Sequence, residues 1–589
     1  FRRSRGLGDV YKRQDLLPYL VRRLLENGAN SSFINRLLDP ETDANWLAEN
    51  PAIRIEKEKI DIPLPKNIFT ERKNSLGFDL SENSNLENLE KSISAHKKNK
   101  INAESIYVNR DEKEKVGQKV YSIANNEEIG TAIFDDPTNV KSALENFASE
   151  KWSKYSVQER SQILIKISDD IEKDPSELIF YLLNESGKTI QNAIDEIREA
   201  IDFLRYYSRQ IIEIHSKKSL QGPTGEINKI FYSPKGNYLC ISPWNFPVAI
   251  LIGQISAALA CGNNVVVKPS ENTSILGYLI VKKFHENGVP IETLQLILGD
   301  GMYGDVLTKV NTVHGVAFTG SLPTAKKIQT NLIQHHKEIV PLIAETGGIN
   351  AMIVDSSALL EQVTDDVVRS AFDSAGQRCS ALRVLCIQEE IYDELIEMIK
   401  GNMEIQEIGD PNNFSTDIGP IINKHALQKL NDYIKGCKDQ GMEVHNCNNS
   451  LKETHMSPTI IEIDNISAIQ EEQFGPILHV MKYKFDDMNS VINQINESGY
   501  GLTMGIHTRI ESRADFIGEK SNVGNIYINR DMVGAVVGSQ PFGGIGLSGS
   551  GFKAGGPNYL LQFLNEKVIS KNSVAFGGNT ELLNLQEDL

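Results

Sequence analysis

The sequence has no uninterrupted apolar run of the roughly 18 residues that a membrane-spanning helix needs. Its longest candidate, FPVAILIGQISAALACG at residues 246–262, is broken by Gln254 and Ser256 and predicts a buried helix instead. Positive charge is also in short supply, with 61 Lys and Arg against 78 Asp and Glu and a net charge of −17. We therefore expect neither membrane insertion nor nucleic-acid binding, although a locally positive site or backbone N–H groups could still hold a small anion.

Cysteine pairs at disulfide or metal spacing are missing as well. The six cysteines include no C-x-x-C pair and no closely spaced framework, and they lie at positions 240, 261, 379, 386, 437 and 447. Such a distribution is typical of reduced thiols in a cytoplasmic protein. We expect a cytoplasmic location and no metal site.

The N-terminal segments lack the marks of an independent domain. Residues 1–14, FRRSRGLGDVYKRQ, have no initiator Met, no apolar signal-peptide core and no cleavage site, and they resemble translated adapter or vector sequence. Residues 15–40 predict a short amphipathic helix with Gly28 as its C-cap, followed by a further helical turn. Residues 41–130 are charged and punctuated by prolines, and they predict a linker or arm without a large core.

Regular alternation of strands and helices begins further along the chain. After Gly236, short apolar runs such as NYLCISPW and NNVVVKPS alternate with helical segments, and a second stretch of this kind runs from NAMIVDSSA to about residue 530. This alternation is typical of parallel βαβ units in a doubly wound sheet. The sequence therefore predicts an α/β protein whose ligands bind outside the carboxyl ends of the strands.

Two stretches are candidates for a nucleotide site. VVVKPSE places Lys268 and Glu271 just past a buried strand, where a carboxylate could bind ribose hydroxyls and repel a 2′-phosphate; two solvated charges are the alternative. Gly299, Gly301 and Gly304 form a G-x-G-x-x-G pattern, but no acidic residue is obvious at the expected distance of about 20 positions. An ordinary turn explains that pattern as well as a phosphate site does.

Three further stretches carry groups suited to acyl chemistry. GQRCSALR places Cys379 between a cation and small residues, either as a nucleophile or as an inert core thiol. SPWNFP holds Asn245 between aromatic residues and prolines, where its amide could stabilise an oxyanion or cap its own turn. In AETGG an apolar run should raise the pKa of Glu345 and suit it to general-base work; pairing with a nearby Lys is the alternative.

The motifs SPWNFP, KPSE, FTGS, ETGG, GQRCSA and EEQFGP occur in the order and approximate spacing of the aldehyde dehydrogenase superfamily, which the chain resembles over roughly residues 130–570. The resemblance implies the aldehyde dehydrogenase fold, with a Rossmann-like NAD-binding domain at residues 131–345 and an α/β catalytic domain at 346–535. A C-terminal segment with a small oligomerisation flap would occupy 536–589. The resemblance also implies a homodimer or a higher homo-oligomer.

The resemblance assigns roles to residues at the matching positions. It implies that Cys379 is the nucleophile, that Asn245 and the Cys379 backbone N–H bind the oxyanion, and that Glu345 activates water to hydrolyse a thioester. It implies NAD as cofactor, bound by Trp244, Lys268, Glu271, Gly320, Ser321, Glu472 and Phe474. The G-x-G-x-x-G loop would then be peripheral to the pyrophosphate.

The stretch NRDMVGAVVGSQPFGG resembles the substrate-anchoring loop of Δ1-pyrroline-5-carboxylate dehydrogenases. The resemblance implies that the backbone N–H groups of Gly534 and Ala535, with the Ser380 hydroxyl, bind the α-carboxylate of L-glutamate 5-semialdehyde. We therefore expect NAD-dependent oxidation of this semialdehyde to L-glutamate in proline catabolism. The rivals are an aldehyde dehydrogenase for another small semialdehyde and a non-catalytic protein on the same fold.

The segment YLVRRLLENGAN at residues 19–30 resembles the last barrel helix of proline dehydrogenases, with Tyr19, Arg22 and Arg23 at the substrate contacts. Together the two resemblances are those of the bacterial bifunctional proline utilisation family. A TIM-type barrel needs about 250 residues, and only its last helix would precede residue 40 here. We expect this chain to be N-terminally truncated and to lack the FAD-dependent proline oxidation of its parent.

Overall fold

The computed structural model describes residues 62–110, 115–145, 147, 149–216, 219–447 and 454–576, with isolated positions between 37 and 50. The chain divides into two compact units, Phe1–Ile68 and Phe69–Leu589, and the helices and strands named below belong to the second. Tyr19, Arg22 and Arg23 lie outside the described residues. Within the described part, no helix is long and apolar enough to span a membrane.

The first large sheet is parallel throughout. Its five strands run in the order β10-β9-β6-β7-β8 and comprise β6 (Asn237–Ile241), β7 (Asn264–Lys268), β8 (Leu294–Leu296), β9 (Gly315–Thr319) and β10 (Leu342–Glu345). Alternate residues of each strand point to opposite faces. Cys240 and Val267 accordingly join one core, whereas Leu239 and Val266 join another. Burial on both faces explains why these strands are continuous apolar runs in the sequence.

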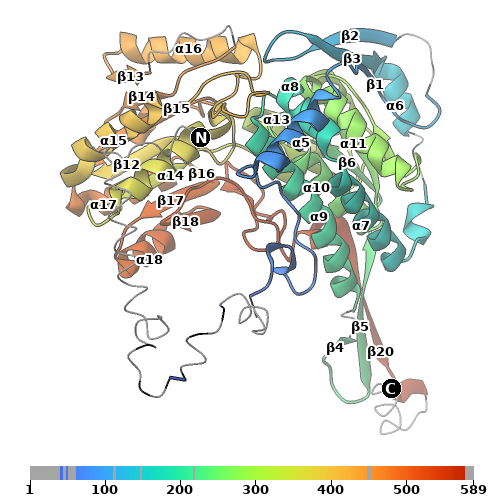
Figure 1. Cartoon of the computed structure of the whole chain (residues 1–589). Coiled ribbons are helices and arrows are strands. Elements are labelled where there is room, and N and C mark those ends of the chain that lie inside the picture. Colours follow the sequence, from blue (N-terminus) through green and yellow to red (C-terminus); the bar gives the residue numbers. More distant parts are fainter. Residues whose placement is uncertain are drawn as a thin grey trace. The chain divides into compact units, whose positions relative to one another are not determined.

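Helices cover this sheet on both faces (Figure 1). They are α10 (Ala249–Ala260), α11 (Ser274–Glu286), α12 (Gly301–Leu307) and α13 (Leu322–His335). Every described position of α10 except Ile250 is buried, which confirms the buried helix predicted from the longest apolar run.

The strand order of this sheet reverses beside β6. Strands β6, β7 and β8 follow one another in one direction, and β9 returns to pair with the other side of β6. Loops that leave neighbouring strands diverge at such a switch point and leave a crevice. Ser242 follows β6 and Gly320 follows β9, so the crevice opens between these two residues.

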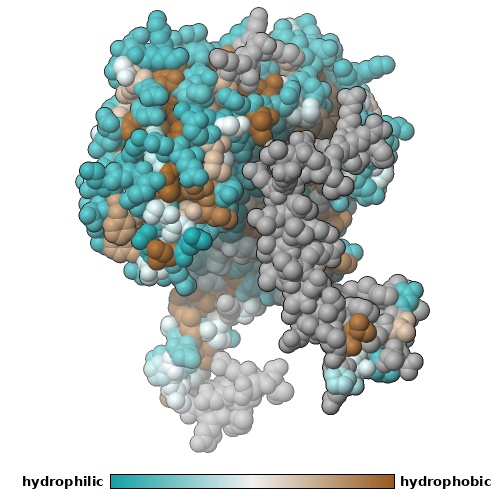
Figure 2. Space-filling view, turned by 60° about the vertical axis from the view of Figure 1, so that its left-hand side comes forward, coloured by the Kyte–Doolittle hydropathy of each residue, from teal (hydrophilic) through white to brown (hydrophobic). Residues whose placement is uncertain are grey.

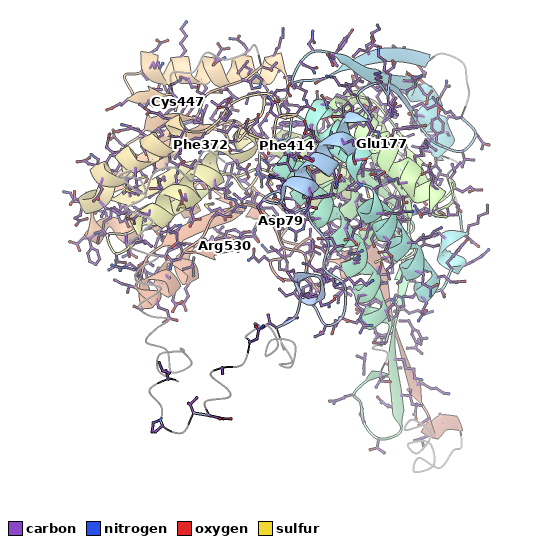
Figure 3. All side chains as sticks on the ribbon, viewed as in Figure 1. Asp79, Glu177, Phe372, Phe414, Cys447 and Arg530 are labelled. Carbon is purple, nitrogen blue, oxygen red and sulfur yellow. The ribbon has the colours of Figure 1, made fainter. Side chains whose placement is uncertain are left out.

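The second large sheet has seven strands in the order β13-β14-β15-β12-β11-β17-β18, and it is parallel except for the β13–β14 pair. The strands are β11 (Ala351–Val354), β12 (Val384–Gln388), β13 (Val444–Asn446), β14 (Thr459–Glu462), β15 (Ile477–Tyr483), β17 (Thr503–His507) and β18 (Asn525–Ile528). The helices that accompany them are α14 (Leu360–Phe372), α15 (Tyr392–Glu404), α16 (Lys424–Asp439), α17 (Met488–Glu497) and α18 (Glu511–Lys520). Figure 3 shows Phe372 and Cys447 in this half of the unit and Glu177 in the other.

The segment before the first large sheet packs against it through helices. Its elements are α5 (Asn83–Ser94), β1 (Ile101–Glu104), β2 (Lys115–Tyr121), β3 (Glu128–Asp135), α6 (Pro137–Glu145), α7 (Val157–Lys173), α8 (Ser176–Glu185) and α9 (Ile190–Ser216). Helix α7 begins with a capping box, in which Ser156 and Glu159 each accept the other's backbone N–H. Leu89, Ala103 and Ile129 join the same core as α9, so residues from the predicted arm contribute to that core.

A narrow antiparallel sheet extends away from the large sheets (Figure 1). Its strands run in the order β20-β5-β4, with bounds β4 (Ser219–Leu220), β5 (Glu226–Pro234) and β20 (Leu564–Asn572). Every residue of β20 after Leu564 is exposed. The resemblance predicted a flap near the C-terminus, and β20 lies in that range, but its partner strand β5 comes from more than 300 residues earlier.

Two short strands, β16 (Tyr500–Gly501) and β19 (Ile545–Gly546), complete the unit. On the face shown in Figure 2 the described residues are mainly hydrophilic, with hydrophobic residues in small groups. A surface of this kind is ordinary for a chain with a net charge of −17.

Candidate active site

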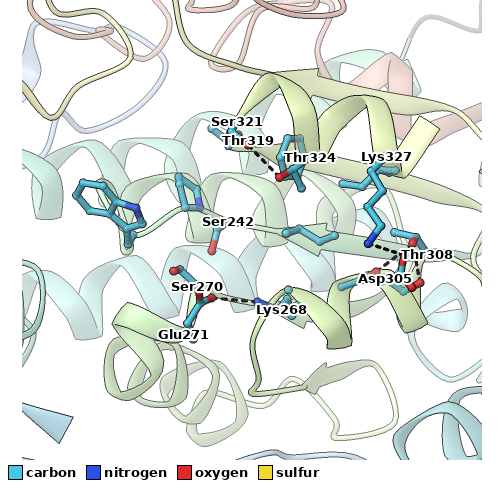
Figure 4. Close-up of a pocket in the computed structure, with 18 of the residues that line it drawn as sticks. Ser242, Lys268, Ser270, Glu271, Asp305, Thr308, Thr319, Ser321, Thr324 and Lys327 are labelled. Carbon is cyan, nitrogen blue, oxygen red and sulfur yellow. Dashed lines mark hydrogen bonds and ion pairs between the residues drawn. The ribbon is translucent and has the colours of Figure 1, made fainter. Parts of the chain in front are cut away.

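A cavity of about 370 Å³ lies at the switch point of the first sheet (Figure 4). Trp244, Lys268, Glu271, Gly320 and Ser321 all line it. They come from three separate loops, which the sheet brings together at the carboxyl ends of β6, β7 and β9. The cavity therefore collects most of the residues for which sequence analysis predicted contact with a dinucleotide.

Lys268 and Glu271 form an ion pair at the wall of this cavity. Lys268 Nζ lies 3.7 Å from Glu271 Oε2, with the Lys side chain 6% exposed and the Glu side chain 47% exposed. Burial lowers the pKa of Lys268, while the nearby Glu271 carboxylate opposes that shift. A buried cation beside an accessible carboxylate suits a pair of ribose hydroxyls, which both donate and accept.

The N-terminus of helix α13 faces the same cavity. Its N-cap Ser321 does not cap the helix with its side chain, which instead bonds Thr324 Oγ1 at 2.9 Å. The N–H groups of Leu322 and Thr324 have no acceptor in the part of the chain that is described. Unpaired N–H groups at a helix N-terminus favour an anion such as a pyrophosphate.

The G-x-G-x-x-G loop is also close by. Gly301 and Gly304 belong to α12 and line the cavity, whereas Gly299 does not. A Cβ added at Gly304 would lie 3.9 Å from Lys268 Cδ, an ordinary contact.

A second cavity, of about 90 Å³, holds the groups suited to acyl chemistry. Cys379, Glu345, Ser380, Gly534 and Ala535 line it together. These residues come from three separate segments of the sequence, and the fold places them around one small volume. This juxtaposition agrees with the roles that the resemblance implied.

The segment before Cys379 is conformationally strained. Ser374 and Ala375 both have φ 54°, and Gly376 follows with φ 64°. Left-handed backbone at non-glycine residues costs free energy and gathers at functional sites. Asn350 holds the far side of the loop, since its amide donates to the carbonyl oxygens of Cys379 at 2.6 Å and Ala381 at 2.9 Å.

The Cys379 thiol is protonated in the protein by itself. Burial raises its pKa to about 12, and the neighbouring Glu472 and Glu345 carboxylates add to that shift. The backbone N–H of Ser380 and the Arg383 guanidinium act in the opposite direction. A base must therefore take the proton before or during attack on an electrophile.

Glu345 is the last residue of β10, and its carboxyl is enclosed. Oε2 accepts the Gly544 N–H at 2.8 Å, and Oε1 is buried without a hydrogen-bond partner in the described structure. Burial raises the pKa of Glu345 well above its usual value, as the apolar run before it predicted. Lys553 donates to the Gly524 carbonyl at 2.7 Å, and its charge partly opposes the rise in the pKa of Glu345.

Asn245 faces the cysteine loop. Its amide is buried, and Nδ2 donates to the Gln377 carbonyl at 3.1 Å, two residues before Cys379. One N–H of this amide is thereby used and the other stays available, because a primary amide has two. Asn245 does not line the cavity itself.

Glu472 and Phe474 lie outside the linings of both cavities. Phe474 meets Trp244 edge to face, with ring centroids 5.6 Å apart. Glu472 approaches the ETGG turn so closely that a Cβ on Gly347 would lie 1.6 Å from Oε2. A side chain at position 347 would require the Glu472 carboxylate to move.

Sequence analysis missed two charged residues here. Arg383, 1% exposed, lies 3.0 Å from Glu472 and is recognisable in the sequence only as one of many cations. Glu199 of α9 lines the second cavity, and burial together with Glu196 raises its pKa to about 8. The sequence did contain a signal for Glu199. This residue follows Glu196 by three positions and lies on the apolar side of α9, a 27-residue amphipathic helix.

The chain matches the family model described as Aldehyde dehydrogenase family over residues 107–569. It is 41% identical over 586 residues to the Bifunctional protein PutA of Escherichia coli, which covers 95% of this chain and 44% of the relative. It is 34% identical over 439 residues to the 1-pyrroline-5-carboxylate dehydrogenase of Geobacillus kaustophilus, which covers 73% of this chain and 84% of the relative. Its structure matches a crystal structure of a Bradyrhizobium japonicum Proline Utilization A (PutA) mutant with a TM-score of 0.83 and 41% identity, which covers 96% of this chain and 55% of that one.

The chain thus spans less than half the length of the bifunctional relative from Escherichia coli. The matches confirm the predicted aldehyde dehydrogenase fold and its α/β class. With the two cavities and their linings, they establish that the chain belongs to the aldehyde dehydrogenase family.

Proposed function

We propose that the chain oxidises L-glutamate 5-semialdehyde, the open form of Δ1-pyrroline-5-carboxylate, to L-glutamate with NAD, as a step of proline catabolism. The observation that carries this proposal is the second cavity, in which Cys379 and Glu345 meet the loop at Gly534 and Ala535. Neither the Gly534 nor the Ala535 N–H has an acceptor among the described residues. Two free N–H groups beside a nucleophile suit an aldehyde that also carries a carboxylate.

The chemistry begins at Cys379. Its Sγ forms a bond to the aldehyde carbon, and the thiol proton passes to the Glu345 carboxylate, whose raised pKa makes it a better base than an exposed one. The carbonyl oxygen becomes an oxyanion, stabilised by the free Asn245 N–H and the Cys379 backbone N–H, which has no acceptor within the described residues.

The remaining steps return the enzyme to its starting state. NAD, when bound, would accept the hydride, and the adduct on Cys379 would then be a thioester. Glu345 releases its first proton to solvent and then takes a proton from the water that attacks the thioester carbon. The carbon–sulfur bond breaks, L-glutamate leaves, and Cys379 regains a proton.

The first cavity supports NAD as the cofactor. Lys268 and Glu271 would bind the adenosine ribose, and the open N-terminus of α13 after Gly320 and Ser321 would bind the pyrophosphate. Glu472 and Phe474 would lie at the nicotinamide ribose, with Trp244 packed on Phe474. The partly exposed Glu271 carboxylate favours NAD over NADP, since a 2′-phosphate would be repelled.

A homo-oligomer and a cytoplasmic location complete the proposal. A ribbon of two long exposed strands is marginal in isolation, and β5 with β20 would gain stability by packing on another subunit. All six cysteines are free thiols, as expected for a reducing compartment. FAD-dependent proline oxidation of a longer parent stays a prediction, because its residues lie outside the described structure.

The test is NADH formation with L-glutamate 5-semialdehyde and with butanal, an aldehyde without a carboxylate. We expect a strong preference for the semialdehyde, abolished turnover in Cys379→Ala, and NAD affinity near that of the wild type. Cys437→Ala is the matched control, because Cys437 is a buried thiol of α16 outside both cavities. Equal use of the two aldehydes would indicate that another small aldehyde is the substrate. Turnover by Cys379→Ala would exclude Cys379 as the nucleophile.

A further inference from the structure

The loop that carries Gly534 and Ala535 is anchored from beneath by a tyrosine. Tyr527 is a buried residue of β18, 6% exposed, and its hydroxyl donates to the Gly534 carbonyl oxygen at 3.1 Å. Neither the family motifs nor the lining of the second cavity includes Tyr527. The contact reaches the Gly534–Ala535 peptide group, which carries one of the two N–H groups proposed to bind the anion.

Peptide geometry makes this hydrogen bond directional. In a trans peptide the C=O of one residue and the N–H of the next point in opposite directions. Because the Gly534 carbonyl is held toward Tyr527, the Ala535 N–H must point away from Tyr527. The Tyr527 hydroxyl therefore orients the Ala535 N–H, which lies on the opposite edge of the same peptide group.

Gly534 is the residue at which this peptide could otherwise rotate. It has φ 85°, a conformation open to glycine, and a Cβ placed there would meet nothing within 4 Å. Gly534 has no side chain to restrict this rotation, and the Tyr527 hydroxyl is the hydrogen-bond donor that the described structure gives to its carbonyl.

The residues just before Gly534 are tied down separately. The Met532 N–H donates to Ser370 Oγ at 3.0 Å, and the Val533 N–H donates to Asp531 Oδ1 at 3.0 Å. With these two N–H groups used inside the protein, the next two in the chain are the free donors. Hydrogen bonds thus hold the two residues before Gly534, and the Tyr527 hydroxyl holds the peptide that follows it.

We infer that Tyr527 is a positioning residue for carboxylate recognition: its hydroxyl orients the Gly534–Ala535 peptide so that the Ala535 N–H faces a substrate carboxylate. The inference rests on the proposed function and names a determinant of its specificity. The phenol acts as a donor at neutral pH, since burial raises the pKa of Tyr527 to about 12.

The test compares Tyr527→Phe with Tyr483→Phe in the full chain. Tyr483 is a matched control, because it is 4% exposed, belongs to the same sheet, and donates to the Val354 carbonyl at the same 3.1 Å. We measure kcat/KM for L-glutamate 5-semialdehyde and for butanal, and the dissociation constant of L-glutamate by calorimetry.

In Tyr527→Phe the ratio of the two kcat/KM values should fall about tenfold toward butanal, mainly through KM, and L-glutamate should bind about tenfold more weakly, as expected for one lost buried hydrogen bond. Tyr483→Phe should leave the ratio and the L-glutamate affinity unchanged. An equal loss on both aldehydes in Tyr527→Phe, or an unchanged ratio, would overturn the inference. A wild type with no preference for the semialdehyde would instead refute the proposed function.

Discussion

The Arg383 guanidinium lies 3.0 Å from the Glu472 carboxylate in a buried ion pair. The same guanidinium donates to the carbonyl oxygens of Gly376 at 2.8 Å, Arg378 at 3.0 Å and Gly475 at 3.1 Å. One side chain therefore joins the strained turn before Cys379 to the segment that carries Phe474.

Arg383→Lys should lower both stability and activity. An ammonium group cannot reach four acceptors arranged around a planar fork, so buried carbonyls would be left unpaired. We expect the free energy of unfolding to fall by about 2–4 kcal/mol and kcat/KM to fall for every aldehyde tested. Denaturant titration and steady-state kinetics measure the two effects. Arg209→Lys is the control, because Arg209 belongs to a largely exposed ion pair; its stability and kcat/KM should stay close to those of the wild type.

Glu345→Gln should remove the base from both steps, the deprotonation of Cys379 and the activation of water. The amide keeps an oxygen for the Gly544 N–H but cannot take a proton from water, so steady-state turnover should fall by roughly 10²–10⁴. Rapid mixing should show that the first turnover to NADH is slowed as well, because Cys379 has lost the base that takes its proton. Glu185→Gln is the control, since that buried carboxyl accepts the N–H groups of Ile275 and Leu276 far from Cys379. Wild-type turnover in Glu345→Gln would exclude Glu345 as the general base.

The pH dependence of stability should change in the same variant. The pKa of Glu345 is higher in the folded protein than its usual 4.5, so the folded state holds this proton more tightly than the unfolded state. Its carboxyl therefore lowers the free energy of unfolding as pH rises above about 4.5 toward the folded-state pKa. Thermal melts should show Glu345→Gln gaining stability relative to the wild type between pH 4 and pH 8. A constant difference across that range would contradict the raised pKa.

Glu271→Ser should relax the choice of cofactor. Removing the carboxylate removes its repulsion of a 2′-phosphate and frees Lys268, 3.7 Å away, to attract it. We expect the ratio of kcat/KM for NAD over NADP to fall by about tenfold or more. Glu286→Ser, at an exposed position of α11, serves as control. An unchanged ratio in Glu271→Ser would refute its place at the ribose.

Glu199→Gln should affect recognition of the substrate's α-ammonium group. Glu199 lines the cavity with Gly534 and Ala535, and a bound cation would favour the ionised form of a carboxyl whose pKa is about 8 in the free protein. KM for L-glutamate 5-semialdehyde should rise about tenfold, while KM for 5-oxopentanoate, which lacks the amine, should stay near the wild-type value. Equal effects on both substrates would point to a structural role for Glu199.

Local patterns in the sequence were enough to predict the α/β class, the buried helix α10, and the raised pKa of Glu345. Each depends on residues near in sequence: alternating apolar runs, a continuous apolar helix, or a carboxylate after an apolar strand. The motif set likewise led to Cys379 and to the loop at Gly534, and the cavity brings them together.

Tertiary structure decided what depends on distant segments. Arg383 contacts Glu472 across 89 positions, Glu199 reaches the cavity from α9, and β20 pairs with a strand from the first half of the chain. The pKa of Cys379 is also a tertiary property, because it is raised by burial and by two carboxylates far away in the sequence. Pattern and propensity act over a few residues, whereas hydrogen-bond partners, burial and electrostatic fields are set by whichever segments the folded chain brings into contact.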